Sequence, residues 1–170
     1  MSELRFFEIY RSNEYLELLF NGICISGGLA ISSGLLGFFV AVVLAVIRYW
    51  DIPILSFICA AYIDFIRNTP LIVQLFFVAF GLPTLIGYVW PFWGHALLGL
   101  TINFSGYFAE ILRSGFAAIA RGQIEAAEAL GLSRWRVFSK VIFPQAIKKM
   151  YASISSQFIF IFLTTGVISE

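Results

Sequence analysis

The sequence predicts an all-α integral membrane protein, mainly because of its low charge content and its charge-free stretches. Hydrophobic residues make up 60% of the 170 residues and charged residues 12%, whereas about one quarter of a soluble domain is charged. Three stretches contain no Asp, Glu, Lys or Arg: 18–47, 68–109 and 150–169. These stretches lack the polar–apolar alternation of membrane-spanning strands, and a helix satisfies its backbone groups internally, so we expect helices.

The charge-free stretches divide into four predicted spans. A helix needs roughly 20 apolar residues to cross the hydrocarbon core, and the first and last stretches are each long enough for one span. The middle stretch is interrupted by helix-breaking residues, which divide it into two spans with a turn between them: Pro83, Gly87, Pro91 and Gly94. The expected spans are about 18–47, 70–88, 95–115 and 147–168.

Residues 49–69 admit two interpretations. We favour an interfacial helix over about 52–67, which keeps Asp64 and Arg67 in contact with water on one helical face, three residues apart. The alternative is that this segment is the first half of a long kinked span. In either case Thr69 and Pro70 offer an N-cap and a first-turn proline, which is a typical start for a new helix.

Lys and Arg are concentrated in one part of the chain. Seven of the eleven lie between Arg113 and Lys149, and loops rich in positive charge stay in the cytoplasm. The loop 121–145 is therefore expected inside. Residues 1–17 hold two Arg and four Glu and are expected to form an external N-terminal segment. The turn over 83–95 has aromatic residues but no Lys, Arg, Asp or Glu, which suits the external interface.

The sequence shows no pattern typical of an enzyme. It contains no G-x-x-x-x-G-K-[ST] nucleotide loop, so we do not expect the chain to hydrolyse ATP. It also has no Ser/His/Asp set and no cluster of metal ligands, so we expect no catalytic residue and no metal site. Cys24 and Cys59 lie in apolar surroundings and are interpreted as small buried hydrophobic residues. His95 is interpreted as a solvated residue of the external turn.

A few polar side chains fall within the predicted spans and are candidates for a translocation path: Gln74, Asn103, Tyr107, Glu110 and Gln157. Polar groups at membrane depth often mark such a path. The alternative is structural, because amides inside a bundle hold helices together. Glu110 is three residues from Arg113 near the cytoplasmic end, where the two side chains can form an ion pair at the level of the lipid headgroups.

The loop 121–145 is predicted to form two short helices joined at a glycine. Residues 123–130 favour a helix, Gly131 fits a helix C-cap and Ser133 fits the N-cap of a second helix. Pro144 is expected to end or kink that second helix. This shape suits either a DNA-binding helix-turn-helix or a short helix that docks in the groove of a cytoplasmic partner.

Docking is the better interpretation of the loop. A DNA-binding module needs a third helix to bury its apolar faces, and the loop is too short for one. For docking, Ala126 and Ala127 allow close contact, Glu125 supplies a charge that sets the register, and Gly131 allows a sharp turn.

The loop resembles the signature of binding-protein-dependent ABC importer permeases: Glu-Ala-Ala, three residues, Gly, nine residues, Ile-x-Leu-Pro. The spacing is the same here, and the matching residues are Glu125, Ala126, Ala127, Gly131 and Pro144. Val141 stands in place of the usual Ile and Phe143 in place of the usual Leu, and both changes keep an apolar side chain.

More of the chain is similar to the polar amino-acid branch of that family, the histidine, glutamine, arginine and opine type. The resemblance covers nearly the whole chain from about Asn21, and the matching segments are 65–83, 106–133, 141–146 and 156–162. Asn68 stands where that branch usually has Gly. Residues 163–166 lack the Lys that the branch often carries.

The resemblance implies a type I importer transmembrane domain in the bacterial inner membrane, with about four of an expected five spans present and a shortened C-terminus. It implies ATPase subunits that bind ATP and Mg, a second permease subunit (the same chain or a paralogue), an external substrate-binding protein and the lipid bilayer. No cofactor is expected on this chain, and no nucleic acid partner. The identity of the polar amino acid stays open.

Two alternative functions are a structural membrane subunit and a membrane-anchored helix-turn-helix regulator. The first leaves Glu125 and Gly131 without a role, and the second needs a further folded cytoplasmic domain.

Overall fold

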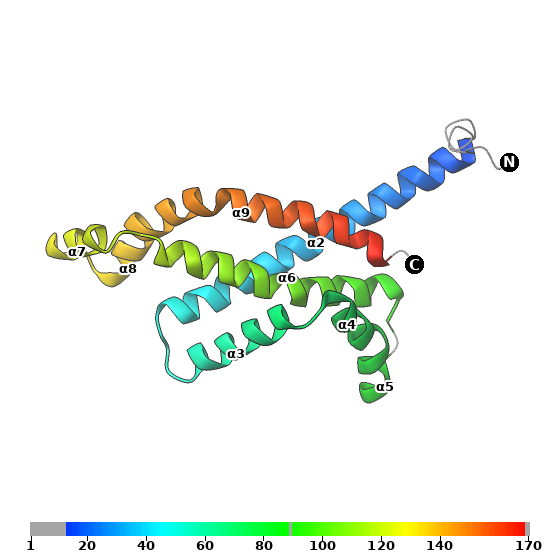
Figure 1. The fold of residues 1–170 in the computed structure, drawn as a ribbon, viewed down its shortest axis with the longest axis horizontal. Coiled ribbons are helices and arrows are strands. Elements are labelled where there is room, and N and C mark those ends of the chain that lie inside the picture. Colours follow the sequence, from blue (N-terminus) through cyan, green and yellow to red (C-terminus); the bar gives the residue numbers. More distant parts are fainter. Residues whose placement is uncertain (1–12, 89, 169–170) are drawn as a thin grey trace.

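The computed structural model describes residues 13–88 and 90–168, and this part of the chain is helical with short connections (Figure 1). Residues 1–12 of the predicted external segment and the last two residues lie outside the described part. The helices are α2 (Asn13–Tyr49), α3 (Leu55–Asn68), α4 (Leu71–Phe76), α5 (Leu82–Ile86), α6 (Phe92–Ala117), α7 (Arg121–Ala129), α8 (Arg134–Val137) and α9 (Phe143–Thr164). The structure also contains two π-helical segments, Phe77–Gly81 and Phe138–Ile142, and a 3₁₀ turn, Thr165–Ile168.

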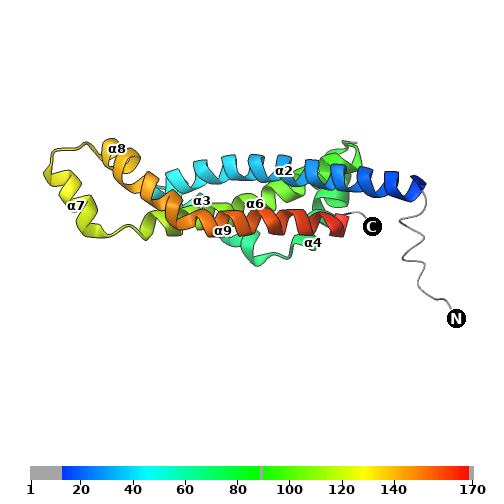
Figure 2. The same cartoon turned by 90° about the horizontal axis from the view of Figure 1, so that it is seen from above.

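The helix α6 is the centre of the bundle. It packs on α2, α3, α4 and α9, and Figures 1 and 2 show α2 and α9 running along it. The start of α2, the start of α6 and the end of α9 lie at one end of the molecule, and α7 and α8 lie at the other. The loop and the start of α2 are thus at opposite ends, as the charge distribution predicts; the side of the membrane that each faces stays a prediction.

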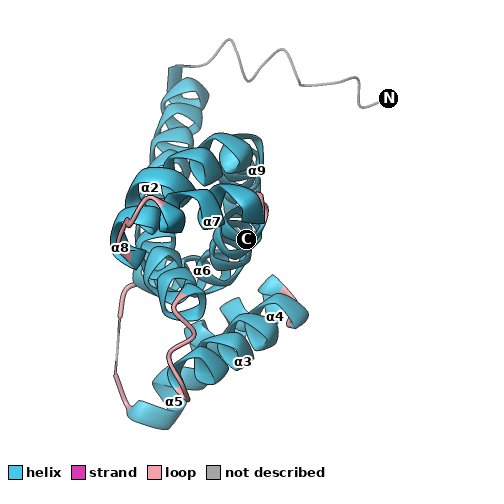
Figure 3. Ribbon diagram, turned by 90° about the vertical axis from the view of Figure 1, so that its left-hand side faces the viewer, coloured by secondary structure: helices cyan, strands magenta, loops and turns pink. Residues whose placement is uncertain are grey.

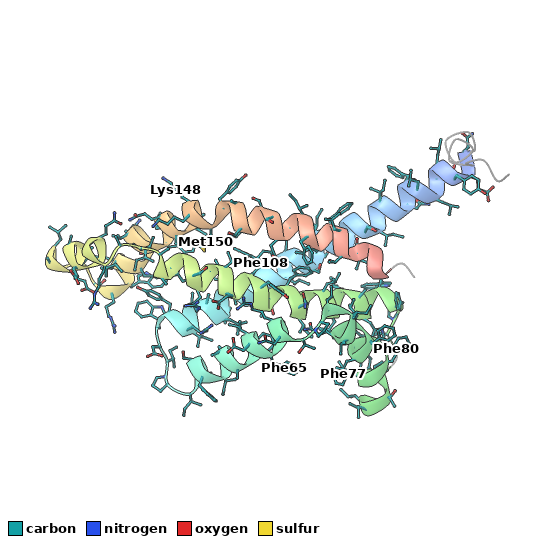
Figure 4. The ribbon with its side chains drawn as sticks, in the orientation of Figure 1. Phe65, Phe77, Phe80, Phe108, Lys148 and Met150 are labelled. Atoms are coloured by element: carbon teal, nitrogen blue, oxygen red, sulfur yellow. The ribbon has the colours of Figure 1, made fainter. Side chains whose placement is uncertain are left out.

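Small side chains let α2 lie close to α6. Gly37 and Ala41 of α2 are buried, one turn apart, and a Cβ atom added at Gly37 would lie 3.2 Å from the carbonyl oxygen of Thr101 in α6. Phe108 of α6 is fully buried and its ring contacts those of Phe38 in α2 and Phe158 in α9, at 5.5 and 5.2 Å between centroids (Figure 4). Large rings and small residues therefore alternate in the core.

The outer surface of the bundle is apolar, as hydrocarbon requires. Phe39 of α2 is 71% exposed, and Phe65, Phe77 and Phe80 are also exposed and project from the bundle (Figure 4). Among the described helices, α2 alone is long and apolar enough to span a membrane by itself. Residues 55–68 and 71–86 pass the same criterion only when they are taken together.

The second predicted span, 70–88, meets the preceding helix at a sharp corner. The α3 helix and the segment Leu71–Ile86 are bent by 105° at residues 69–70, and α3 packs on α2 and α6 (Figure 1). A bent pair of this kind is either a broken span or a re-entrant segment, so the interfacial helix over 52–67 and the kinked span both stay predictions. Pro70 begins the new segment as the N-cap residue of α4, whereas the Thr69 hydroxyl donates back to the Phe65 carbonyl at 2.7 Å.

Both π-helical segments come just before a proline. The N–H of Leu82 donates to the Phe77 carbonyl before Pro83, and the N–H of Phe143 donates to the Phe138 carbonyl before Pro144. A proline has no N–H and its ring clashes with the carbonyl four residues earlier, and one wider turn accommodates this. Pro144 therefore does not end the second helix of the loop, which continues from α8 through residues 138–142 into α9.

We expect Gly37→Val to lower the thermal stability of the permease in detergent by about 1–3 kcal/mol, because the added methyl groups force α6 away from α2. Gly28→Val is the matched control on the same helix, since Gly28 has no neighbouring atom within 4 Å of an added Cβ. Equal melting temperatures for the two variants would show that the close approach is not required.

Candidate functional site

The loop between α7 and α8 turns at a glycine that the backbone requires. Gly131 has φ of 75°, a left-handed conformation that favours glycine. Its N–H donates to the Glu128 carbonyl at 2.9 Å, and the N–H of Leu132 donates to the Ala127 carbonyl at 3.3 Å. These two bonds form a Schellman motif. Ser133 takes the expected N-cap position with extended backbone, but its side chain makes no capping hydrogen bond.

The predicted loop residues lie on different sides of α7. Glu125 and Ala126 are exposed, whereas Ala127 is 5% exposed and turned inward. The α7 helix packs mainly on α8 and on the π-helical segment Phe138–Ile142, so Ala127 belongs to that internal contact. Figure 3, which views the molecule from the loop end, shows α7 and α8 in front of the long helices. Glu125 is paired with Arg121 at 3.2 Å on the outer surface.

Leu130 is an exposed residue that the sequence analysis did not single out. It is the C-cap residue of α7, directly before Gly131, and it is 82% exposed. Together with Glu125 and Ala126 it gives the loop a mixed acidic and apolar outer surface. Periodicity could not identify it, because helical spacing predicts which face of a helix is apolar but not whether a residue at the helix end is covered.

Gln74 and Asn103 form an internal cross-link. The Asn103 Nδ2 donates to Gln74 Oε1 at 3.0 Å, and Gln74 Nε2 donates to the carbonyls of Ile66 and Thr69 at 2.8 and 3.0 Å. Both side chains are buried. The pair joins α6 to the corner between α3 and α4, where the proline leaves backbone carbonyls without a helical donor. This geometry favours the structural interpretation of the two amides.

Glu110 is surrounded by arginines from three helices. Its carboxylate accepts from Arg113 Nε at 3.0 Å and from Arg48 Nη1 at 3.4 Å, and Arg67 Nη1 lies 3.9 Å away. The expected pair with Arg113 is thus present, and Arg48 of α2 and Arg67 of α3 add to it. The Glu110 side chain is 22% exposed, so the ion pairs are partly shielded from water. They tie α2, α3 and α6 together.

The five candidate path residues have different surroundings. Gln74 and Asn103 are bonded to each other, and Glu110 is held by arginines. Tyr107 is half-buried on α6 beside the Phe104 ring. Gln157 of α9 has a buried Nε2 without a hydrogen-bond partner among the described residues. A role of any of the five in translocation stays a prediction.

Comparison with known proteins identifies the family. Residues 33–169 match the family described as binding-protein-dependent transport system inner membrane component, so the chain belongs to that family of membrane-embedded permease components. It is 37% identical to the probable glutamine ABC transporter permease protein GlnP of Bacillus subtilis (strain 168), over 92% of this chain and 71% of the relative. It is 34% identical to the octopine transport system permease protein OccM of Rhizobium radiobacter, over 89% of this chain and 65% of the relative.

Solved structures agree on the fold. A crystal structure of an amino acid ABC transporter with histidines matches with a TM-score of 0.86 at 31% identity, over 92% of this chain and 72% of that chain. The MetNI methionine ABC transporter in an inward-facing conformation matches with a TM-score of 0.78 at 21% identity, over 91% and 74%. The fold is therefore that of a type I importer transmembrane domain, as the sequence predicts, and the chain is a partial-length permease.

We expect a double-mutant cycle of Gln74→Leu and Asn103→Leu to give a coupling energy of about 0.5–1.5 kcal/mol in thermal unfolding, because each amide satisfies the other. Gln157→Leu is the control, since the Gln157 Nε2 has no partner among the residues that the structure describes, and its replacement is expected to be neutral or stabilising. Additive effects of the two single substitutions would contradict the cross-link.

We expect Glu110→Gln to destabilise the permease by about 1–3 kcal/mol, because three guanidinium groups then lose their shared counter-ion. Thermal unfolding in detergent at low ionic strength measures this. Glu128→Gln, at an exposed position of α7, is expected to unfold within a degree or so of the wild type.

Proposed function

We propose that this chain is the membrane-spanning permease subunit of an ATP-driven importer, which forms part of the translocation path for a polar amino acid or a related opine. We further propose that the loop 121–145 couples it to a separate ATPase. The outer surface of α7 carries this proposal: Glu125, Ala126 and Leu130 are exposed beside a turn that Gly131 holds in one conformation. Short, exposed, rigid helices of this kind fit grooves on partner proteins.

The mechanism requires a stiff loop, and the observed geometry supports one. The second helix of the loop, α8, runs into α9 through Pro144. A displacement of α7 is therefore passed through α8 to α9. On its other side α7 follows α6 after a short connection, and Lys149 of α9 donates to the Ala118 carbonyl at the end of α6 at 2.6 Å. ATP binding by the partner can shift the permease between states only if the docked helix differs in energy between them.

The structural surroundings of α8 disfavour a DNA-binding regulator. Val137 and Phe138 are 2% and 4% exposed and pack against the membrane bundle. A recognition helix must be free to enter the major groove, whereas α8 has four residues and leads directly into α9.

We propose the remaining partners by analogy with the family. A second permease subunit, the same chain or a paralogue, pairs with this chain around the path, and an external binding protein delivers the substrate. ATP and Mg bind to the ATPase subunits. We place the start of α2 outside the inner membrane and α7 in the cytoplasm; the start of α2 and α7 lie at opposite ends of the molecule in Figure 2.

A polar amino acid or an opine is the proposed substrate class because the relatives include probable glutamine, octopine and arginine permeases. Glu110 is the one acidic residue of the predicted spans, and its carboxylate forms ion pairs with three arginines. It therefore offers no free carboxylate to a cationic side chain. Uptake of radiolabelled glutamine, arginine, histidine and octopine by the reconstituted transporter tests the class; uptake of none of these by an ATP-hydrolysing complex would exclude it.

We expect Gly131→Ala to reduce co-purification of the ATPase severalfold, because an alanine at positive φ costs about 1–2 kcal/mol and shifts the loop away from its docking conformation. Gly122→Ala is the matched control: both glycines have open space around an added Cβ, but positive φ occurs only at Gly131 of the two. Glu125→Arg is expected to remove the ATPase while the permease stays folded.

Full retention of the ATPase and of uptake in both Gly131→Ala and Glu125→Arg would show that this loop is not the docking element. The structural-subunit interpretation would then become the better one.

A further inference from the structure

Aromatic rings from four parts of the chain meet at the base of the loop. The ring of Phe138, in the π-helical segment, lies 4.8 Å from Tyr49, 5.4 Å from Phe116, 5.9 Å from Trp135 and 6.0 Å from Trp50, between centroids. Phe138 is 4% exposed. We call these five residues the aromatic junction. It joins the end of α2 and the end of α6 to the second helix of the loop.

Within the junction, Trp50 and Trp135 form a stack. Their ring centroids are 6.5 Å apart and their planes differ by 21°. Trp50 directly follows α2, and Trp135 belongs to α8. Trp135 is 62% exposed, so most of its surface is not part of the core. The Trp135 side chain therefore buries little apolar surface but contacts the residue that follows α2. We interpret it as a side chain that positions α8 relative to α2 more than one that stabilises the fold.

The end of α2 is also fixed to α6. Arg48 pairs with Glu110 at 3.4 Å, and the Tyr49 ring packs on that of Phe116 with centroids 5.8 Å apart. Since α7 packs mainly on α8 and the π-helical segment, a push on α7 reaches Trp135 and Phe138 first. The displacement then reaches residues 48–50 at the end of α2. The α2 helix packs on α6 along much of its length, so the displacement can continue to α6.

We propose that Trp135, stacked on Trp50, is a positioning residue that transmits movement of the loop 121–145 to α2. This inference rests on the proposed docking of an ATPase to that loop. In this arrangement the ATPase moves three helices: α6 and α9, which the loop joins covalently, and α2, which it reaches through the stack. Loss of a single aromatic stack is expected to weaken the coupling about two- to tenfold.

A native cysteine allows α2 to be followed without a substrate. Cys24, which the sequence analysis interpreted as buried, is exposed on α2, whereas Cys59 is buried as expected. A maleimide dye sensitive to its environment therefore labels Cys24 selectively when the ATPase and any paralogous permease subunit are cysteine-free. Cys24 lies about 40 Å along the helix from Trp50, and a tilt of α2 is therefore large at this position. The response is the change in dye fluorescence when the assembled transporter is trapped with ATP and vanadate.

We expect the wild-type complex to give a clear response and Trp135→Ala to reduce it about two- to tenfold, with the ATPase still bound and ATP hydrolysis retained. Trp50→Ala has a similar effect, and the double variant is no worse than either alone, because both substitutions remove the same stack. Trp135→Phe restores most of the response. Trp93→Ala, which removes a 60% exposed indole at the start of α6, is the matched control and keeps the full response.

Three results overturn the inference: a full response in Trp135→Ala, no response in the wild-type complex, or loss of the ATPase from Trp135→Ala. The last would make Trp135 a docking residue. If the wild-type permease does not retain the ATPase at all, the proposed function itself fails, and co-purification separates that outcome from the others.

Discussion

The contact between α2 and α6 is the interaction on which the rest of the structure depends. In hydrocarbon the hydrophobic effect does not drive helices together, so they associate where their surfaces fit closely. Gly37 permits that fit by leaving the backbone of α6 within reach of α2. With α2 in place on one side, α6 also receives α3, α4 and α9, and the ends of α2 and α6 come close enough for Arg48 to reach Glu110.

The prolines of the chain have different consequences, and the local hydrogen bonds decide which. At Pro70 the backbone turns by 105°, and Gln74 satisfies two of the carbonyls that the corner exposes. At Pro83 and Pro144 the helix widens into a π-turn and continues. The second kind of response matters for the proposed function, because at Pro144 it makes α8 and α9 one continuous element. A helix that ended at Pro144 would separate α8 from the bundle by a flexible joint.

Two groups of polar side chains inside the bundle are satisfied by partners among the described residues. Gln74 and Asn103 form a hydrogen bond with each other, and Glu110 is the shared counter-ion of three arginines. An unsatisfied polar group is expensive in a membrane, so these arrangements are first of all structural. The aromatic junction also holds helices together, at the base of the loop. There the contacts are between aromatic rings and not between charged groups. Contacts at both levels connect the base of the loop to α2 and α6.

The sequence by itself determined the helical membrane fold, the family and the two-helix loop, because apolar length, charge-free stretches and the spacing from Glu125 to Pro144 are local properties of the chain. It also predicted the left-handed turn at Gly131, since few other residues adopt that conformation. Only the tertiary structure decided the 105° corner before Leu71, the passage of the helix through Pro144, the arginines around Glu110 and the stack of Trp50 on Trp135. The arginines and the stack join residues far apart in sequence, and periodicity specifies which face of a helix is buried but not which partner covers it. At the two prolines, the sequence predicts a break or a kink but not which of them forms.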